Sequence, residues 1–340
     1  MRGLVLDFLK SYLSNKKQFV NTNGLNSANS DITYGVPQGS VLGPLFFNIY
    51  ANEISSLNLG LDVIQYADDT VLVCSGKVLA ELSNKSNNAL QIFRDWCCFN
   101  KLALNINKTK YMLFSPVTCH VQPVLSIGGT DLERVNEYKY LGILIDDKLK
   151  FNNHINVIKT KISRLGGITF KIGKFLSVEA ARNFYYAMVQ SIISYNIVFW
   201  GASSKTLLNE LQRKQNVVVR NLFQHHFSRN LSTSQLYNNM KLLKIGDFHK
   251  YSVALTFFKA VYLNKFPLVL EAVLNHAWIH NYNTRRVHLF RLPLTRVEPD
   301  LNCFLYQAMS LFNTLPQDIR ECNSLNSFKH KLNVFLRREY

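Results

Sequence analysis

Residues Leu61 to Gly76 read LDVIQYADDTVLVCSG, and this stretch decides the fold. Two adjacent carboxylates, Asp68 and Asp69, stand between two runs of β-branched and aliphatic residues. Neighbouring residues in a regular strand point to opposite faces of the sheet, so two carboxylates that act together must lie at a turn. The sequence therefore predicts a strand, a tight turn and a second strand, with both carboxylates facing one side of the turn.

Paired carboxylates of this kind have two interpretations. Two such charges within a few ångströms repel each other, and a divalent metal removes the conflict. Mg²⁺ favours carboxylate oxygens and usually keeps waters and substrate phosphates as its remaining ligands. The alternative is plain turn chemistry, because aspartate is favoured in tight turns on its own account. The pair alone leaves both interpretations open.

The flanking segments predict a mixture of helices and short strands, which is an α+β fold. Residues 4–20 suit an amphipathic helix leading into a strand, and residues 35–54 a Gly- and Pro-rich loop ahead of an apolar helix. Residues 78–104 predict a long helix packed on a sheet, because apolar residues recur there at helical spacing. Residues 102–115 suit a turn into a strand, residues 138–151 a strand ending in a polar turn, and the chain after about residue 153 is mostly helical in pattern.

Length and charge set the organisation. A chain of 340 residues predicts two or three folded units. The formal net charge is +17, yet residues 1–150 carry 14 Lys and Arg against 13 Asp and Glu, whereas residues 151–340 carry 25 against 9. A polyanionic partner for the second half is indicated. The alternative is a generally basic soluble protein, which the one-sided distribution disfavours.

Cysteine usage and hydropathy indicate the compartment. The six cysteines form no CxxC pair, which favours a reducing intracellular site, in the nucleus or the cytoplasm, over secretion. The two most apolar segments, residues 185–201 and 251–263, are interrupted by polar residues. They predict core helices and no association with a membrane.

Four motifs together carry a family resemblance. The YADD turn is preceded by GVPQGSVLGPLFFNIYANEI and followed by LNINKTKYMLF and YKYLGILID. In order and spacing they resemble the palm of a reverse transcriptase of the non-LTR retrotransposon (LINE-type) class. Residues 304–336 also resemble the segment that closes many proteins of that class, so the likeness runs from near Met1 to the end.

The resemblance implies a specific form of the α+β fold. We expect a truncated reverse-transcriptase palm, with an antiparallel sheet and packed helices, then a mainly helical thumb and a C-terminal basic region. The expected domains are residues 1–130 (partial fingers and palm with the PQGS and YADD motifs), 131–200 (primer grip and helical thumb) and 201–340 (a basic, mainly helical nucleic-acid-binding region).

The resemblance also assigns roles. Asp68 and Asp69 match the metal-binding carboxylates, with Asp68 the stronger candidate for a direct ligand. Two Mg²⁺ ions there would activate the primer 3′-hydroxyl and neutralise the leaving pyrophosphate. Residues expected beside the primer terminus are Tyr66 and Ala67, and those expected against the incoming nucleotide and template base are Pro37, Gln38 and Gly39.

Two further motifs have weaker signals. Lys108 and Lys110 match a motif associated with the triphosphate and with protonation of the leaving group, although a lysine in a surface turn is more often simply solvated. Tyr140, Leu141 and Gly142 resemble the primer grip, where a glycine-permitted turn would approach the primer strand. A strand with a structural glycine is the alternative.

Basic residues of the second half extend the prediction to nucleic acid. On a helical stretch, Lys159, Lys161 and Arg164 suit a thumb that faces duplex phosphates. Further on, Arg285, Arg286 and Arg291 are interleaved with aromatic residues, which suits single-stranded nucleic acid. A solvated basic face is the alternative. His276 and His280 have a spacing that suits a metal on a helix, but no Cys or acidic partner lies near them in the sequence.

The family places another metal-binding aspartate on a palm strand upstream of the region matched by residues 8–20, and Asp7 does not substitute for it. We therefore expect an incomplete two-ion Mg²⁺ site and no useful polymerase activity from this chain alone. Expected partners are an RNA template, a DNA primer or target and, if the chain is active, deoxynucleoside triphosphates. The alternative is a non-catalytic, nucleic-acid-binding remnant of a decayed element.

Overall fold

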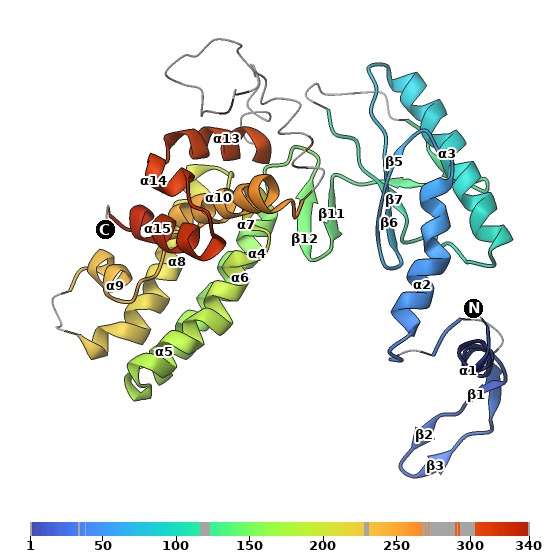
Figure 1. The fold of residues 1–340 in the computed structure, drawn as a ribbon, viewed down its shortest axis with the longest axis horizontal. Helices are drawn as coiled ribbons and strands as arrows, with labels where there is room; N and C mark the ends of the chain where they lie inside the picture. Colours follow the sequence, from blue (N-terminus) through green and yellow to red (C-terminus); the bar gives the residue numbers. More distant parts are fainter. Residues whose placement is uncertain are drawn as a thin grey trace. The chain divides into compact units, whose positions relative to one another are not determined.

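The protein is represented by a computed structural model that describes residues 2–32, 35–37, 39–115, 123–227, 231–266, 269, 271, 290, 292 and 303–338 (Figure 1). The chain divides into two compact units. Unit 1 comprises Met1–Tyr111 with Val117–Val135, and unit 2 comprises Met112–Pro116 with Asn136–Tyr340. Helices alternate with small two-stranded sheets in the described ranges, which confirms the α+β class. The expected three-domain division stays a prediction.

Unit 1 begins as the sequence predicts, with a helix that leads into a strand. Helix α1 (Leu4–Leu13) is followed by β1 (Lys16–Gln18), which pairs antiparallel with β4 (Ser30–Ile32). Between them lies the small hairpin of β2 (Asn21–Thr22) and β3 (Leu25–Asn26). The ring of Tyr12 in α1 packs in a tilted arrangement against Phe46, with 5.6 Å between ring centroids, which joins α1 to the next helix.

That next helix and the central hairpin share one core. Helix α2 (Gly43–Ala51) continues into η1 (Asn52–Ser56), and the hairpin of β5 (Asp62–Tyr66) and β6 (Asp69–Val73) precedes α3 (Leu79–Phe99) (Figure 1). Val63 and Leu72 of the hairpin pack against the cluster that α2, η1 and α3 bury. The long helix expected within residues 78–104 is confirmed. Its buried residues are Ala89, Phe93, Trp96 and Cys97.

Short strands complete unit 1. The predicted strand after the NINKTK turn is β7 (Lys110–Tyr111), which pairs parallel with β10 (Glu133–Arg134). Another hairpin, of β8 (Ser126–Ile127) and β9 (Thr130–Asp131), lies against α3.

Unit 2 opens with a hairpin where the sequence predicted one strand. Strands β11 (Glu137–Tyr140) and β12 (Ile143–Asp146) are antiparallel, with Tyr140 paired to Ile143. Positive φ angles at Leu141 (44°) and Gly142 (85°) reverse the chain, so the single-strand prediction for residues 138–151 was wrong. The expected polar turn follows β12, where the Asp146 carboxylate accepts the backbone N–H groups of Lys148, Lys150 and Phe151.

The rest of unit 2 is helical in the described residues, as predicted. Helix α4 packs along α8, and the proximity of Lys159 to Glu210 and of Gly166 to Val217 shows that the two helices run in the same direction. The helices are α4 (Asn152–Ile172), η2 (Gly173–Phe175), α5 (Val178–Phe184), η3 (Tyr185–Gln190), α6 (Ser191–Ser194), α7 (Ile197–Trp200), α8 (Lys205–Phe223), η4 (Gln224–His226), α9 (Thr233–Asn239), α10 (Ile245–Leu263), α13 (Phe304–Thr314), α14 (Gln317–Arg320) and α15 (Leu325–Leu336).

Two apolar clusters hold unit 2 together. One joins α4, α8, α9 and the segment from α5 to α7, and the other joins α10, α13, α14 and α15. The apolar run at residues 251–263 lies inside α10, as predicted. The run at residues 185–201 is not one helix, because Tyr195 is extended and Asn196 is left-handed (φ 52°) between α6 and α7. No helix among the described residues meets the length and hydropathy of a membrane span.

Candidate active site

The YADD turn is a two-residue hairpin loop. Tyr66 pairs with Asp69 across the ladder, so Ala67 and Asp68 form the loop and Asp69 is the first residue of β6. Ala67 has φ 52°. A positive φ costs a non-glycine residue about 1–2 kcal/mol, and such strain recurs at functional sites. The predicted strand, turn and strand are thus confirmed, with an unpredicted strained alanine beside the carboxylates.

Both carboxylates face solvent. Asp68 and Asp69 are exposed, and neither side-chain carboxylate makes a hydrogen bond or ion pair with the residues described in the structure. Tyr66 has 64% of its surface exposed next to them. The two carboxylates at this tip offer hard oxygen donors. Mg²⁺ is usually bound through one or two carboxylates, with waters and phosphates as its other ligands, so the tip suits this ion. No group of three or more potential metal ligands gathers within the described ranges.

The PQGS loop is folded by its own serine. Ser40 donates both its backbone N–H (3.3 Å) and its hydroxyl (2.6 Å) to the Pro37 carbonyl, and the Tyr12 hydroxyl bonds with the Ser40 hydroxyl. Gly39 has φ 78°, and a Cβ there would meet nothing within 4 Å. The glycine is therefore required by the backbone conformation, which leaves an open backbone surface. Gln38 lies outside the described residues.

The two candidate lysines have different surroundings. Lys108 lies in the turn before β7, where its backbone N–H bonds to the Asn105 side chain. Lys110 lies in β7 and its ammonium is 2.5 Å from the Glu133 carboxylate of β10. A role for Lys110 at a triphosphate therefore requires that this ion pair open.

The expected primer-grip residues form the tip of the β11–β12 hairpin. Tyr140 ends β11, and Leu141 and Gly142 make the two-residue loop. Two consecutive positive φ angles are typical of a type I′ turn. This geometry favours the turn interpretation over a strand with a structural glycine.

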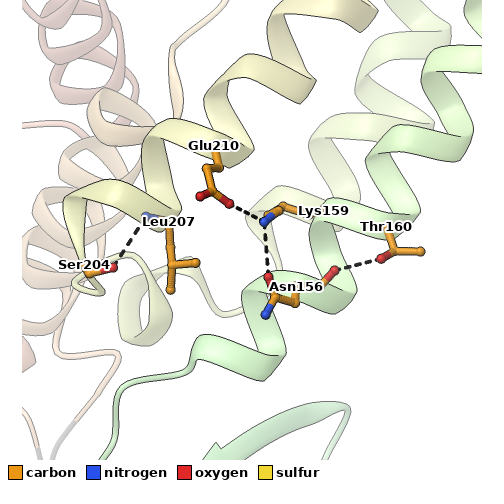
Figure 2. Close-up of polar contacts among 6 residues, drawn as sticks. All are labelled: Asn156, Lys159, Thr160, Ser204, Leu207 and Glu210. Atoms are coloured by element: carbon orange, nitrogen blue, oxygen red, sulfur yellow. Dashed lines mark hydrogen bonds and ion pairs between the residues drawn. The ribbon is translucent and has the colours of Figure 1, made fainter.

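The candidate thumb residues are not equivalent on α4. Lys161 and Arg164 are exposed, whereas the Lys159 ammonium reaches across to Glu210 of α8 and also contacts the Asn156 side chain (Figure 2). The Lys159 ammonium holds the pKa of the Glu210 carboxyl below its usual range, first by the hydrogen bond and then by its charge. Lys159 therefore ties α4 to α8, and the open basic face consists of Lys161, Arg164, Lys171 and Lys174.

That open face combines charge with exposed apolar groups. Helix α4 contains no acidic residue. Ile168, Phe170 and Phe175 are 47%, 74% and 78% exposed, and the Lys174 ammonium lies 4.8 Å from the Phe175 ring centroid. A basic helix with exposed aromatic rings suits a nucleic-acid backbone and its bases. The other candidates, Arg285, Arg286 and Arg291, and the pair His276 and His280, lie outside the described residues.

Comparison with known proteins gives a consistent result. Residues 4–145 match the family described as "Reverse transcriptase (RNA-dependent DNA polymerase)". The chain is 27% identical over 250 residues to the RNA-directed DNA polymerase from mobile element jockey of Drosophila melanogaster, covering 70% of this chain and 27% of that protein. It is 29% identical over 227 residues to the probable RNA-directed DNA polymerase from transposon BS of the same species, covering 62% and 25%.

Residues 4–145 carry a reverse transcriptase domain, which is similar to those of non-LTR retrotransposons. A further relative is the polyprotein of the type-1 retrotransposable element R1 of Bradysia coprophila, 25% identical over 215 residues, covering 60% of this chain and 21% of that protein. The chain thus spans about a quarter of the length of these relatives. Reverse transcriptases act on nucleic-acid templates and nucleotides with divalent metal ions, which agrees with the exposed carboxylates.

Sequence reasoning missed several residues that position the candidate binding residues of unit 2. Asp146 shapes the turn that leads into α4, and Glu210 holds Lys159. Tyr195 contacts the Leu141–Gly142 turn from a segment that the sequence predicted as core helix. The one sequence signal was Asn196, since asparagine tolerates the left-handed conformation that interrupts the helix there.

Proposed function

We propose that residues 1–340 form the palm and thumb portion of an RNA-directed DNA polymerase, with Asp68 and Asp69 as Mg²⁺ ligands. The observation that carries the proposal is the strained hairpin tip, which presents two carboxylates free of protein partners within the described structure. Bound Mg²⁺ would supply activation of the primer 3′-hydroxyl and neutralisation of the pyrophosphate leaving group. Asp68, in the loop itself, is the first candidate for direct ligation.

Unit 1 would also hold the incoming nucleotide. The PQGS loop offers open backbone at Gly39 and a carbonyl fixed by Ser40, which suits close approach by a nucleotide or template base. Tyr66 is the exposed ring beside the carboxylates and would contact the primer terminus.

Unit 2 would hold the template and primer. The Leu141–Gly142 turn would meet the primer strand, and Lys161, Arg164, Lys171 and Lys174 would neutralise its phosphates. These contacts are independent of base sequence, because they engage the backbone.

The test is primer extension on an RNA template with Mg²⁺, by any polypeptide that contains residues 1–340 and synthesises DNA. Asp68→Asn is expected to abolish synthesis, because a neutral amide oxygen binds Mg²⁺ much more weakly than a carboxylate. Asp62→Asn is the matched control, since Asp62 is also exposed on the same hairpin but lies at its opposite end, paired with Val73. Synthesis that survives Asp68→Asn would overturn the proposal.

Nucleic-acid binding without catalysis is the second candidate function. It is favoured by the concentration of positive charge after residue 150, which does not depend on the carboxylates of unit 1. Under this alternative, binding of RNA by the chain is unchanged in Asp68→Asn and no polypeptide containing the chain synthesises DNA.

A further inference from the structure

The turn at Leu141 and Gly142 is strained by its own sequence. A type I′ turn needs a positive φ at both loop positions and usually takes Asn or Gly there. Here the first position is leucine, with φ 44°. A branched, apolar side chain in the left-handed region persists only where surrounding structure holds it. The turn therefore requires an external support.

Tyr195 supplies that support from 54 residues further along the chain. Its hydroxyl donates a hydrogen bond to the Leu141 carbonyl oxygen, at the strained position itself. Its ring covers Gly142, because a Cβ on that glycine would lie 3.4 Å from Cε1 and 3.5 Å from the hydroxyl oxygen. One side chain thus contacts both residues of the loop.

Tyr195 is itself held in place. Its backbone carbonyl accepts a hydrogen bond of 2.9 Å from Nε1 of Trp200, which is fully buried. The Trp200 ring packs edge-on against His154 of α4, with 6.2 Å between centroids. His154 Nδ1 in turn accepts the Leu144 N–H of β12 at 3.4 Å. The hairpin is therefore fixed at its tip and along β12 by one connected set of contacts.

We infer that Tyr195 is a positioning residue, which holds the Leu141–Gly142 turn in the conformation that meets a primer strand. The inference rests on the proposed function of this turn. The hydroxyl acts through Leu141, because its hydrogen bond goes to the loop carbonyl. The same contacts continue to α4 through Trp200 and His154. The turn and the basic helix are therefore held in a fixed arrangement in which both can contact nucleic acid.

The test compares Tyr195→Phe with Tyr186→Phe. The first removes the hydroxyl and keeps the ring, and the second removes the hydroxyl of Tyr186 in η3, another half-exposed tyrosine. Affinity is measured by fluorescence anisotropy for a primer–template duplex with a recessed 3′ end and for a blunt duplex of equal length. We expect Tyr195→Phe to lower the preference for the recessed end about fivefold, the size of one net hydrogen bond. Tyr186→Phe is expected to keep it.

A rescue variant separates positioning from direct contact. Glycine adopts a positive φ without strain, so Leu141→Gly in the Tyr195→Phe background is expected to restore the preference. Amide hydrogen exchange at Gly142 and Ile143 is expected to accelerate in Tyr195→Phe and to slow again in the double variant.

The outcomes are distinct. A wild-type chain that prefers the recessed end, with Tyr195→Phe unchanged, overturns the inference and leaves the proposed function standing. A loss that Leu141→Gly does not rescue also overturns it, because the hydroxyl would then act directly on the primer. A wild-type chain without any preference overturns both the inference and the proposed role of the turn.

Discussion

Ala67 and Leu141 each adopt a positive φ at the tip of a hairpin that carries candidate site residues. Glycine would adopt a positive φ at either position at lower conformational cost. The backbone strain therefore arises because alanine and leucine occupy these two positions. Sequence patterning predicted the Asp68–Asp69 turn, because two adjacent carboxylates interrupt the alternation of a strand. It could not predict the strain, since neither alanine nor leucine signals a left-handed residue. The contact that Tyr195 makes with the turn could not be predicted either, because its hydrogen-bond partner is a backbone carbonyl 54 residues away.

A prediction at this scale concerns His249 of α10. Burial lowers the pKa of its imidazole to about 4, with a hydrogen bond to the Val198 backbone opposing the shift and Lys250 adding to it. The unfolded chain protonates this histidine near pH 6.5 while the folded chain does not, so the free energy of unfolding falls as pH drops from about 6.5 to about 4. The full loss is about 3 kcal/mol.

His249→Asn is expected to remove that part of the pH dependence, because the asparagine amide does not titrate. Urea unfolding at pH 7, 6 and 5 measures it in both proteins. His154, whose pKa is also lowered by burial and by Lys161, is present in both, so the difference between them isolates His249. Equal slopes in the two proteins would contradict the assignment.

At the scale of elements, α4 is held against α8 by close backbone approach. A Cβ at Gly173 would lie 2.0 Å from the Asn221 carbonyl oxygen, whereas a Cβ at the exposed Gly167 would meet nothing within 4 Å. The sequence predicted a basic amphipathic helix here, and it is confirmed. The sequence did not predict that this helix packs on α8 or that Lys159 forms an ion pair. The partner of Lys159 is Glu210, which lies 51 residues further along the chain.

The two glycines give a matched pair of variants. Gly173→Ala is expected to lower the free energy of unfolding by about 1–3 kcal/mol, because the methyl group overpacks against the α8 backbone. Gly167→Ala is expected to raise it by about 0.5–1 kcal/mol, because alanine has the higher helix propensity and no neighbour obstructs it. Denaturant unfolding of both variants measures the difference, and a common sign would refute the packing described.

The hairpins show where local sequence is ambiguous. The segment YKYLGILID was predicted as one strand, yet Leu141 and Gly142 reverse it. Apolar residues occupy both sides of the turn, so the pattern lacked the polar residues that usually mark one. The YADD hairpin was predictable because its tip is charged.

For the whole molecule, charge is the property that separates the two units. The excess of Lys and Arg after residue 150 predicted a nucleic-acid-binding region from composition alone. The structure then shows the open basic face of α4 in unit 2.

Replacing Lys161, Arg164 and Lys171 by Gln is expected to weaken RNA binding and to reduce the slope of log affinity against log salt by about 2–3 units, roughly one for each lost phosphate contact. The control replaces Lys10, Lys77 and Lys85, which are exposed in unit 1, and so removes the same net charge. Filter binding between low and moderate salt measures both. Equal slopes for the two triple variants would show that only total charge matters.

The most direct measurement of the central claim is Mg²⁺-dependent binding of a fluorescent deoxynucleoside triphosphate to the 340-residue chain. Asp68→Asn and Asp69→Asn are each expected to weaken binding at least about tenfold, since each removes a carboxylate from the hairpin tip. Asp62→Asn, at the other end of the same hairpin, is expected to leave it unchanged. Equal affinity in all four proteins, or affinity independent of Mg²⁺, would contradict the assignment of a metal and nucleotide site to this turn.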